Sequence, residues 1–399
     1  MKAKLATLAA MAALAASPAH GQKKYDPGAS DSEIKVGNTN PYSGPASAYG
    51  TIGKTIAAYF KMVNEQGGIN GRKVNFITYD DGYSPPKTVE MARKLVEQDQ
   101  VLFLFQTLGT PPNTAIHKYM NAKKVPQLFV ATGATKWNDP QNFPWTMGWQ
   151  PNYQDEAKIY VRYLLKEKPN AKIGILYQND DYGKDYLKGI KDGLGAKAKS
   201  MIVSEVSYEV ADPTVDSQIV QLQASGADVF FNITTPKFAA QAIRKAYDIG
   251  WKPLHYLNNV SNSVGSVLTP AGLEKAVGII SSAYIKDATD STWANDKAIA
   301  EWREFMKKYY PEGNQADVFN VYGYSVAATI AQVLRQCGDN LTRENVMRQA
   351  ANMKGWRPET LLPGITISTS ADDFAPIQAV QLERFNGKQW ELFGSVLGK

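Results

Sequence analysis

Residues 103–115 constrain the fold of this chain more strongly than any other stretch. They begin with the apolar run Phe103, Leu104 and Phe105, which is typical of a strand buried on both faces. Gly109 then supplies a turn, and Thr110 followed by two prolines predicts a helix start with Thr110 as its N-cap. The stretch therefore predicts a strand, a tight turn and a helix.

The same stretch indicates a binding role. Its turn lies at the carboxyl end of a strand, where open α/β sheets bind their ligands. Bare N–H groups and the positive end of the helix would face outward there, which suits a carboxylate or a similar anion. Taken alone, the stretch fits an ordinary strand–helix loop equally well, so the rest of the chain has to decide.

The length and the N-terminal sequence define the class of protein. The 399 residues, 44% hydrophobic and 21% charged, are typical of a globular chain with two or three domains. Residues 1–21 predict a cleavable signal peptide, because Lys2 and Lys4 precede a run rich in Ala and Leu. Cleavage after Ala19 or after Gly21 fits the small-residue rule equally well.

Cysteine and charge content narrow the location and the partners. Cys337 is the single cysteine and lies far from the signal, so we expect no lipid anchor and no internal disulfide. This favours a freely soluble periplasmic protein. The formal charge falls from +6 to +4 without Lys2 and Lys4, and no basic run exceeds a pair, so no nucleic-acid partner is expected.

The motifs of catalysis and metal binding are missing from the sequence. Apart from His20 in the signal, His117 and His255 are far apart, and neither has a metal-ligand pattern around it. No phosphate-cradling glycine loop and no nucleophile elbow occurs. We therefore expect no cofactor, no metal and no enzymatic activity.

Strands and helices alternate in two series. The first series has expected strands at 34–39, 74–79, 103–105 and 127–131, and an aromatic segment at 142–150 interrupts it. The second has expected strands at 172–177, 201–206, 228–232 and 254–257. After residue 283 the pattern is mainly helical, with short strand-like runs at 364–368, 377–385 and 389–393. Such alternation predicts an α/β fold of two lobes with parallel, doubly wound sheets.

Several short motifs occur in a familiar order: IKVG at 34–37, SGP at 43–45, YG at 49–50, VN at 63–64, GGING at 67–71, YDD at 79–81, KVP at 124–126 and DYG at 181–183. Together they resemble the periplasmic solute-binding proteins of the branched-chain amino acid (Leu/Ile/Val-binding) family, which serve ABC importers. The resemblance runs from residue 33 to the end of the chain.

The resemblance implies the type I periplasmic binding fold, in which two Rossmann-like lobes are joined by a hinge of three crossovers and close like a Venus flytrap. We expect the crossovers at 146–151, 281–283 and 362–364. Lobe 1 would then comprise 33–150 and 284–362, and lobe 2 would comprise 151–283 and 363–399. A monomer would deliver its small ligand, chemically unaltered, to an inner-membrane permease.

The resemblance also implies the contact residues. Thr110 matches the hydroxyl residue that holds the ligand carboxylate, and Tyr49 and Tyr182 match family aromatics. Trp149 fits either a ligand contact or hinge packing. The full expected set is Tyr42, Tyr49, Gln106, Thr107, Gly109, Thr110, Ala131, Thr132, Gly133, Trp149, Tyr153, Tyr182, Thr235 and Asn259.

Two expected positions depart from the family pattern. Thr235 stands where a tyrosine is expected, and Asn259 stands where an acidic residue would hold an α-ammonium group. A neutral amide compensates a buried ammonium poorly. This favours an aromatic or other apolar carboxylic acid as ligand, unless Asp155, Asp180 or Asp181 supplies the charge. The alternative is a branched-chain or aromatic amino acid; a sensory module or an exported enzyme is less expected.

Overall fold

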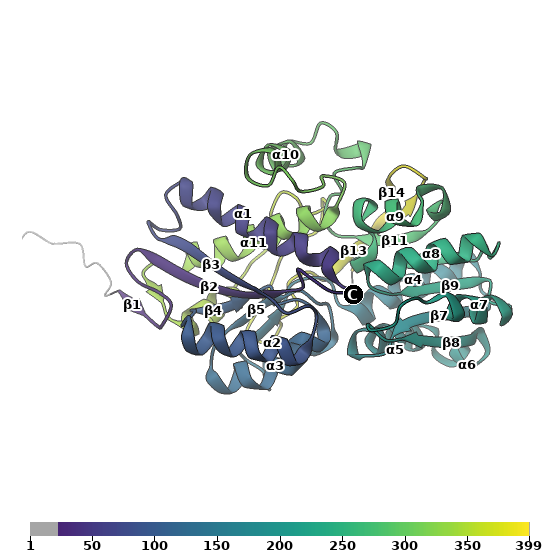
Figure 1. Ribbon diagram of the computed structural model, residues 1–399, viewed down its shortest axis with the longest axis horizontal. Coiled ribbons are helices and arrows are strands. Elements are labelled where there is room, and N and C mark those ends of the chain that lie inside the picture. Colours follow the sequence, from purple (N-terminus) through teal and green to yellow (C-terminus); the bar gives the residue numbers. More distant parts are fainter. Residues whose placement is uncertain (1–22, 399) are drawn as a thin grey trace, which may run out of the picture.

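The computed structural model describes residues 23–398, so the predicted signal peptide lies outside the described residues. Two sheets, each accompanied by helices, lie side by side along the long axis of the molecule (Figure 1). A small parallel pair, β1 (Lys24–Tyr25) with β12 (Asn340–Leu341), lies apart from both sheets. Within residues 23–398, no helix combines the length and the apolar character needed to cross a membrane.

The first sheet is parallel throughout, with strand order β3-β2-β4-β5-β6. Its strands are β2 (Glu33–Asn40), β3 (Lys73–Asp80), β4 (Phe103–Phe105), β5 (Gln127–Val130) and β6 (Thr146–Gly148); the helices between them are α1 (Gly50–Glu65), α2 (Pro85–Arg93) and α3 (Thr110–Lys123). The three residues of β4 are fully buried, as expected for a strand covered on both faces.

The second sheet has seven strands in the order β14-β13-β11-β10-β9-β7-β8. β13 pairs antiparallel with both of its neighbours, β11 and β14, and the other pairs are parallel. Its elements are α4 (Tyr153–Glu167), β7 (Ile173–Gln178), α5 (Asp181–Leu194), α6 (Ala198–Met201), β8 (Ile202–Tyr208), α7 (Asp216–Ala224), β9 (Val229–Ile233), α8 (Pro236–Asp248), β10 (Leu254–Leu257), α9 (Thr269–Ala271), β11 (Ile280–Ala283), β13 (Ala379–Phe385) and β14 (Trp390–Gly398).

The chain returns to the first sheet between β11 and β13. The returning helices are α10 (Lys297–Tyr309), α11 (Val318–Cys337) and α12 (Arg343–Ala350), and α11 packs against α1. Thr360 then bonds Ser325 of α11 through their hydroxyls (2.5 Å), and the Phe374 N–H donates to Asn138 (2.6 Å). These contacts hold residues 360–374 to the first half of the molecule, which contains the first sheet, whereas the second half contains the second sheet. The lobe boundaries themselves stay a prediction.

The alternation of strands and helices agrees with the sequence, and three details differ. Residues 142–150, expected to interrupt the first series of strands, contain β6 of the first sheet. Residues 364–368 do not form a strand; Ile367 makes an isolated bridge to Trp356. Thr110 is not the N-cap of α3 but its first residue, and Gly109 takes the cap position with a φ of 95°. A side chain at Gly109 would also collide with the ring of Tyr83, so the turn needs a glycine there.

Candidate functional site

A cavity lies between the two sheets, with an empty volume of about 770 Å³ that includes its open mouth. Both halves of the chain contribute to its wall. The lining residues are Tyr49, Ile52, Tyr83, Leu108, Gly109, Thr110, Ala131, Gln150, Tyr153, Tyr182, Thr235, Asn259, Val260, Asn262, Ser282, Ala283, Tyr284, Ile285, Asp287, Val318, Phe319, Tyr322 and Glu383.

The structure brings a subset of the expected contact residues together around this cavity. They are Tyr49, Gly109, Thr110, Ala131, Tyr153, Tyr182, Thr235 and Asn259. They come from segments more than 200 residues apart, and each follows or precedes a strand of one of the two sheets. The parallel strands therefore position these side chains by directing their carboxyl ends toward a shared space.

The other expected residues lie outside the lining, and most of them hold the loops that form it. Tyr42 bonds Thr78 on β3 (2.7 Å between hydroxyls), and Thr107 donates to Asn113 (2.5 Å). Gln106 has a φ of 56° and donates its amide to the Phe129 carbonyl. At Gly133, an added Cβ would lie 2.2 Å from the Pro151 carbonyl oxygen, so close backbone packing explains this glycine.

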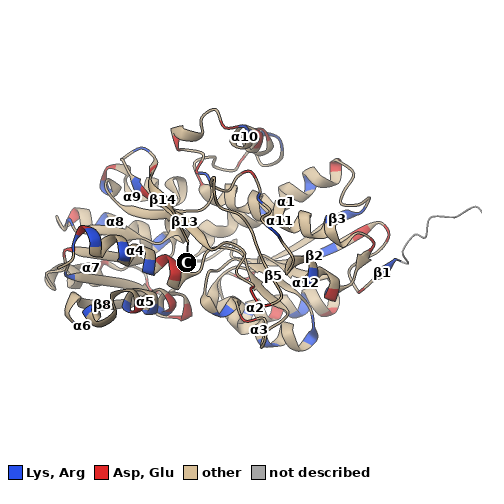
Figure 2. Ribbon diagram, turned by 180° about the vertical axis from the view of Figure 1, so that it is seen from behind, with Lys and Arg blue, Asp and Glu red and all other residues tan. Residues whose placement is uncertain are grey.

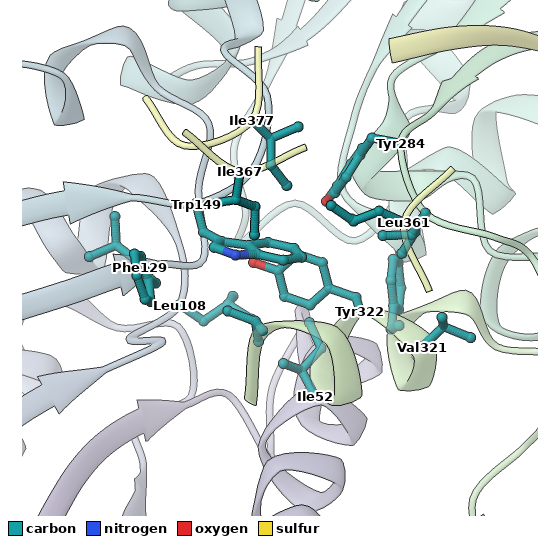
Figure 3. Close-up of a cluster of buried hydrophobic side chains, with 14 of the residues drawn as sticks. Ile52, Leu108, Phe129, Trp149, Tyr284, Val321, Tyr322, Leu361, Ile367 and Ile377 are labelled. Atoms are coloured by element: carbon teal, nitrogen blue, oxygen red, sulfur yellow. The ribbon is translucent and has the colours of Figure 1, made fainter. Parts of the chain in front are cut away.

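Trp149 is a core residue in this structure. Its ring lies among buried apolar side chains, with Tyr284 and Tyr322 beside it (Figure 3). The Tyr322 and Tyr284 rings meet it edge-on at centroid distances of 5.1 and 6.0 Å, and its Nε1 donates to Thr329 (3.2 Å). Trp149 thus supports two lining tyrosines from behind rather than facing the cavity.

The start of α3 offers fewer N–H groups than the sequence suggested. Pro111 and Pro112 have none, and the Asn113 N–H donates to the Gly109 carbonyl (3.0 Å). Thr110 keeps an N–H without a backbone acceptor among residues 23–398, while its hydroxyl bonds that of Thr132 (2.6 Å). The expectation of several bare amides at this helix start was therefore wrong, because two prolines remove the donors.

The half of the molecule that contains the second sheet presents polar atoms that lack partners. The Tyr182 hydroxyl and the Asn259 side-chain nitrogen are buried without a hydrogen bond among residues 23–398. Both residues line the cavity. A buried polar atom without a partner costs about 1–3 kcal/mol, so these two atoms are sites where a bound ligand would be stabilised.

Glu156, on the first turn of α4, fixes the backbone next to Asn259. Its buried carboxylate accepts hydrogen bonds from Tyr160 (2.5 Å), Tyr186 (2.6 Å) and the Asn259 N–H (2.9 Å). Burial raises the pKa of Glu156 from 4.5 to about 6, although these three donors oppose the shift.

Two carboxyl groups in the lining were not identified from the sequence. The Glu383 Oε1 on β13 accepts a hydrogen bond from Asn262 (2.7 Å), and the Asp287 Oδ1 accepts two from Thr289 (2.7 Å each). Burial raises the pKa of Asp287 to about 6 and that of Glu383 well above its usual range. No Lys, Arg or His is among the described residues that line the cavity.

The acidic residues that the sequence suggested as substitutes have other roles. Asp180 caps α5 through the N–H of Tyr182 (2.9 Å), and Asp181 pairs with Lys136 (2.6 Å). Asp155 lies in the first turn of α4 and contacts Lys158 at 3.8 Å. None of the three lines the cavity. No clear signal in the sequence marks Glu383, because residues 377–385 also contain Gln378, Gln381 and Arg384.

Direct contacts join the two halves around the cavity. Tyr49 donates its hydroxyl to the Val260 carbonyl (2.8 Å), and the Ser263 hydroxyl donates to Asp317 (2.8 Å). On another side, Lys136 pairs with Asp181. Charged residues of both signs are interspersed over the helices of both halves (Figure 2). Within residues 23–398, no group of three or more His, Cys, Asp or Glu side chains could hold a metal ion.

Comparison with known proteins identifies the family. Residues 33–389 match the family described as periplasmic binding protein. The Leu/Ile/Val-binding protein homolog 1 of Brucella abortus is 26% identical over 79% of this chain and 82% of its own.

Two solved structures share the fold. The branched chain amino acid ABC transporter protein from Thermus thermophilus with bound valine has a TM-score of 0.82, with 16% identity over 92% of this chain and 97% of its own. The fatty acid ABC transporter substrate-binding protein from Thermomonospora curvata has a TM-score of 0.79, with 22% identity over 94% and 95%.

These matches confirm the predicted type I periplasmic binding fold and agree with a binding protein rather than an enzyme. With a family match that spans most of its length and a cavity lined from both sheets, the chain belongs to the periplasmic binding protein family.

Proposed function

We propose that this protein is the periplasmic substrate-binding component of an ABC importer and that it captures a small amino acid between its two halves. The observation that carries the proposal is the shared cavity, where unpaired Tyr182 and Asn259 atoms lie in a wall built from both sheets. The two halves would close on the ligand and present it, unaltered, to a membrane permease. We expect the protein to act as a monomer.

The charges of the lining favour an amino acid over a simple acid. The lining includes two carboxyl groups and no basic side chain. A simple anion would lack a positive partner in such a site, whereas the amino group of a zwitterion would meet a carboxylate. Asn259 had favoured a simple acid because it replaces an expected acidic residue, and Asp287 and Glu383 weaken that argument.

A simple carboxylic acid remains the second candidate. The Thr110 N–H and the Asn259 amide supply neutral donors for a carboxylate, and the apolar and aromatic lining suits a hydrocarbon body. A solved structure with the same fold is described as a fatty acid transporter component.

A thermal-shift panel tests the proposal. It should cover branched, aromatic and basic amino acids, matched aliphatic and aromatic acids, and short amides. A ligand that binds the folded form raises the unfolding midpoint with its concentration. We expect an amino acid to give the largest shift and to be recovered unchanged by mass spectrometry. Shifts from simple acids alone would favour the second candidate, and turnover of a bound compound would exclude both.

A further inference from the structure

The carboxyl groups of Asp287 and Glu383 are incompletely bonded by the protein. Asp287 uses Oδ1 for both of its hydrogen bonds, and Glu383 uses Oε1 for its bond from Asn262. The second oxygen of each group has no protein donor among residues 23–398. Both side chains are more than nine-tenths buried, and both line the cavity. An ionised carboxylate is costly to bury without a cation, in agreement with the raised pKa values of both groups, and a cationic group beside their second oxygens would stabilise the ionised form.

The basic side chains near this wall have other partners. Lys286 pairs with Asp296 (2.7 Å), and Arg303 donates to the Ala288 carbonyl (2.6 Å). Besides burial, the charge of Asp290 raises the pKa of both Asp287 and Glu383, and Arg303 opposes this rise only at Asp287. The protein therefore supplies acids to this end of the cavity without a neutralising base in the lining.

The order of strands places this wall away from Tyr182. Tyr182 follows β7, and Asp287 follows β11, which is separated from β7 by β9 and β10 in the sheet. Three strand spacings correspond to about 14 Å. Lys136 links Thr114 of α3 (2.9 Å) to Asp181 of α5 (2.6 Å), so the α3 start that carries Thr110 lies toward the Tyr182 side. The lining therefore has two polar ends, one neutral and one acidic.

The wall between the two ends is largely aromatic. The centroids of the Tyr49 and Phe319 rings are 5.1 Å apart. Tyr284, which also lines the cavity, precedes Asp287 by three residues. Aromatic faces accommodate a hydrocarbon chain and also attract an organic cation. An α-amino acid carries both charged groups on one carbon atom and cannot place them at opposite ends of such a wall.

We propose that Asp287 and Glu383 form a subsite for a cationic group of the ligand, and that the ligand is an amino acid whose cationic group lies at the far end of an extended chain. The proposal rests on the function proposed above, the capture of an amino acid between the two halves, and places the carboxylate of that ligand at the Thr110 and Tyr182 end. An ω-amino acid or an amino acid with a basic side chain has the required separation of charges.

Isomeric probes give the sharpest test. Isothermal titration calorimetry should compare 4-aminobutanoate, 6-aminohexanoate and 8-aminooctanoate with their 2-amino isomers, which contain the same atoms. Lysine, hexanoate and 1,6-diaminohexane complete the panel. We expect at least one ω-amino probe or lysine to bind tenfold or more tightly than the matched 2-amino acid. Tighter binding of the 2-amino isomers, or no binding of any ω-amino probe and of lysine, would overturn the proposal.

Substitutions identify the subsite. Glu383→Gln and Asp287→Asn keep the size of the side chain, and each should lower the affinity for the best ω-amino or basic probe at least tenfold while leaving hexanoate binding unchanged. Asp228→Asn is the control for the change in net charge. Asp228 lies just before β9 in a surface ion pair with Lys168 (2.9 Å), and its substitution should leave the affinity for the probe unchanged. Melting curves of each variant verify folding.

The outcomes separate this proposal from the proposed function. If amino acids bind but both variants bind every probe as the parent does, the acidic subsite is wrong and the receptor function stands. If 1,6-diaminohexane binds and weakens in both variants while no carboxylate probe binds, the two carboxyl groups bind a cation, but the extended amino acid ligand and the proposed amino acid function are both wrong.

Discussion

The two halves of the molecule contribute different kinds of polar group to the cavity. In the first half, the groups near the lining bond one another, as in the pairs of Thr110 with Thr132 and of Thr107 with Asn113. In the second half, the Tyr182 hydroxyl and the Asn259 amide nitrogen have no partner among residues 23–398. Among the lining side chains, the first half thus offers a Thr110 hydroxyl that is already paired, beside a free Thr110 N–H, and the second half holds the side-chain groups whose hydrogen bonds a ligand would complete.

The largest effect is expected for Asn259→Asp with hexanoate or another simple acid as ligand. The new carboxylate would lie in the lining, next to Glu156, and would repel the carboxylate of the ligand. Affinity measured by calorimetry should fall at least tenfold. Asn142→Asp, which adds the same charge on an exposed loop, is the control. Tighter binding of the simple acid would show that Asn259 does not face the ligand carboxylate.

Glu156→Gln should change the pH dependence of stability. The folded-state pKa of about 6 lies above the ordinary 4.5, so the folded protein retains a proton that the unfolded chain releases between these values. The parent therefore loses about 2 kcal/mol of stability from this group as the pH rises through that window. Urea unfolding between pH 4 and 7 should show a smaller decline in the variant.

Parallel stability curves for the parent and Glu156→Gln would contradict a raised pKa at this residue. Asp287 and Asp317, whose pKa values are also raised to about 6, contribute to both curves, so the difference between the two proteins isolates Glu156. The result decides whether the backbone support of Asn259 in the second half depends on charge.

Tyr182→Phe should weaken the ligand found in the thermal-shift panel about fivefold, which corresponds to about 1 kcal/mol for one hydrogen bond. Folding should be unaffected, because this hydroxyl has no protein partner to lose. Tyr186→Phe is the matched contrast, since its hydroxyl donates to Glu156 and its loss should lower the melting temperature. A Tyr182→Phe protein with parental affinity would remove this hydroxyl from the site.

Thr110→Val should have the smallest effect, about twofold, because the Thr110 hydroxyl already bonds Thr132 and the valine retains the free N–H. Titration of the same ligand measures it. A loss larger than that of Tyr182→Phe would reverse the comparison between the two halves, and unchanged affinity would restrict the role of Thr110 to its backbone.

The sequence predicted the fold well because strand periodicity and turn residues are local signals. Residues 103–115 form the expected strand, turn and helix, with the cap one residue earlier because Gly109 alone fits the close approach to Tyr83. The acidic wall could not be predicted. Asp287 and Glu383 are nearly 100 residues apart, and the pairing of β11 with β13 that brings them near one cavity is a long-range feature.

A crystal structure of the protein with the ligand that gives the largest thermal shift tests the central claim most directly. We predict a chemically unaltered ligand between the two sheets, with its polar atoms within hydrogen-bond distance of the Tyr182 hydroxyl and the Asn259 side-chain nitrogen. A ligand bound elsewhere, or a cavity filled by the protein's own side chains in the complex, would contradict it.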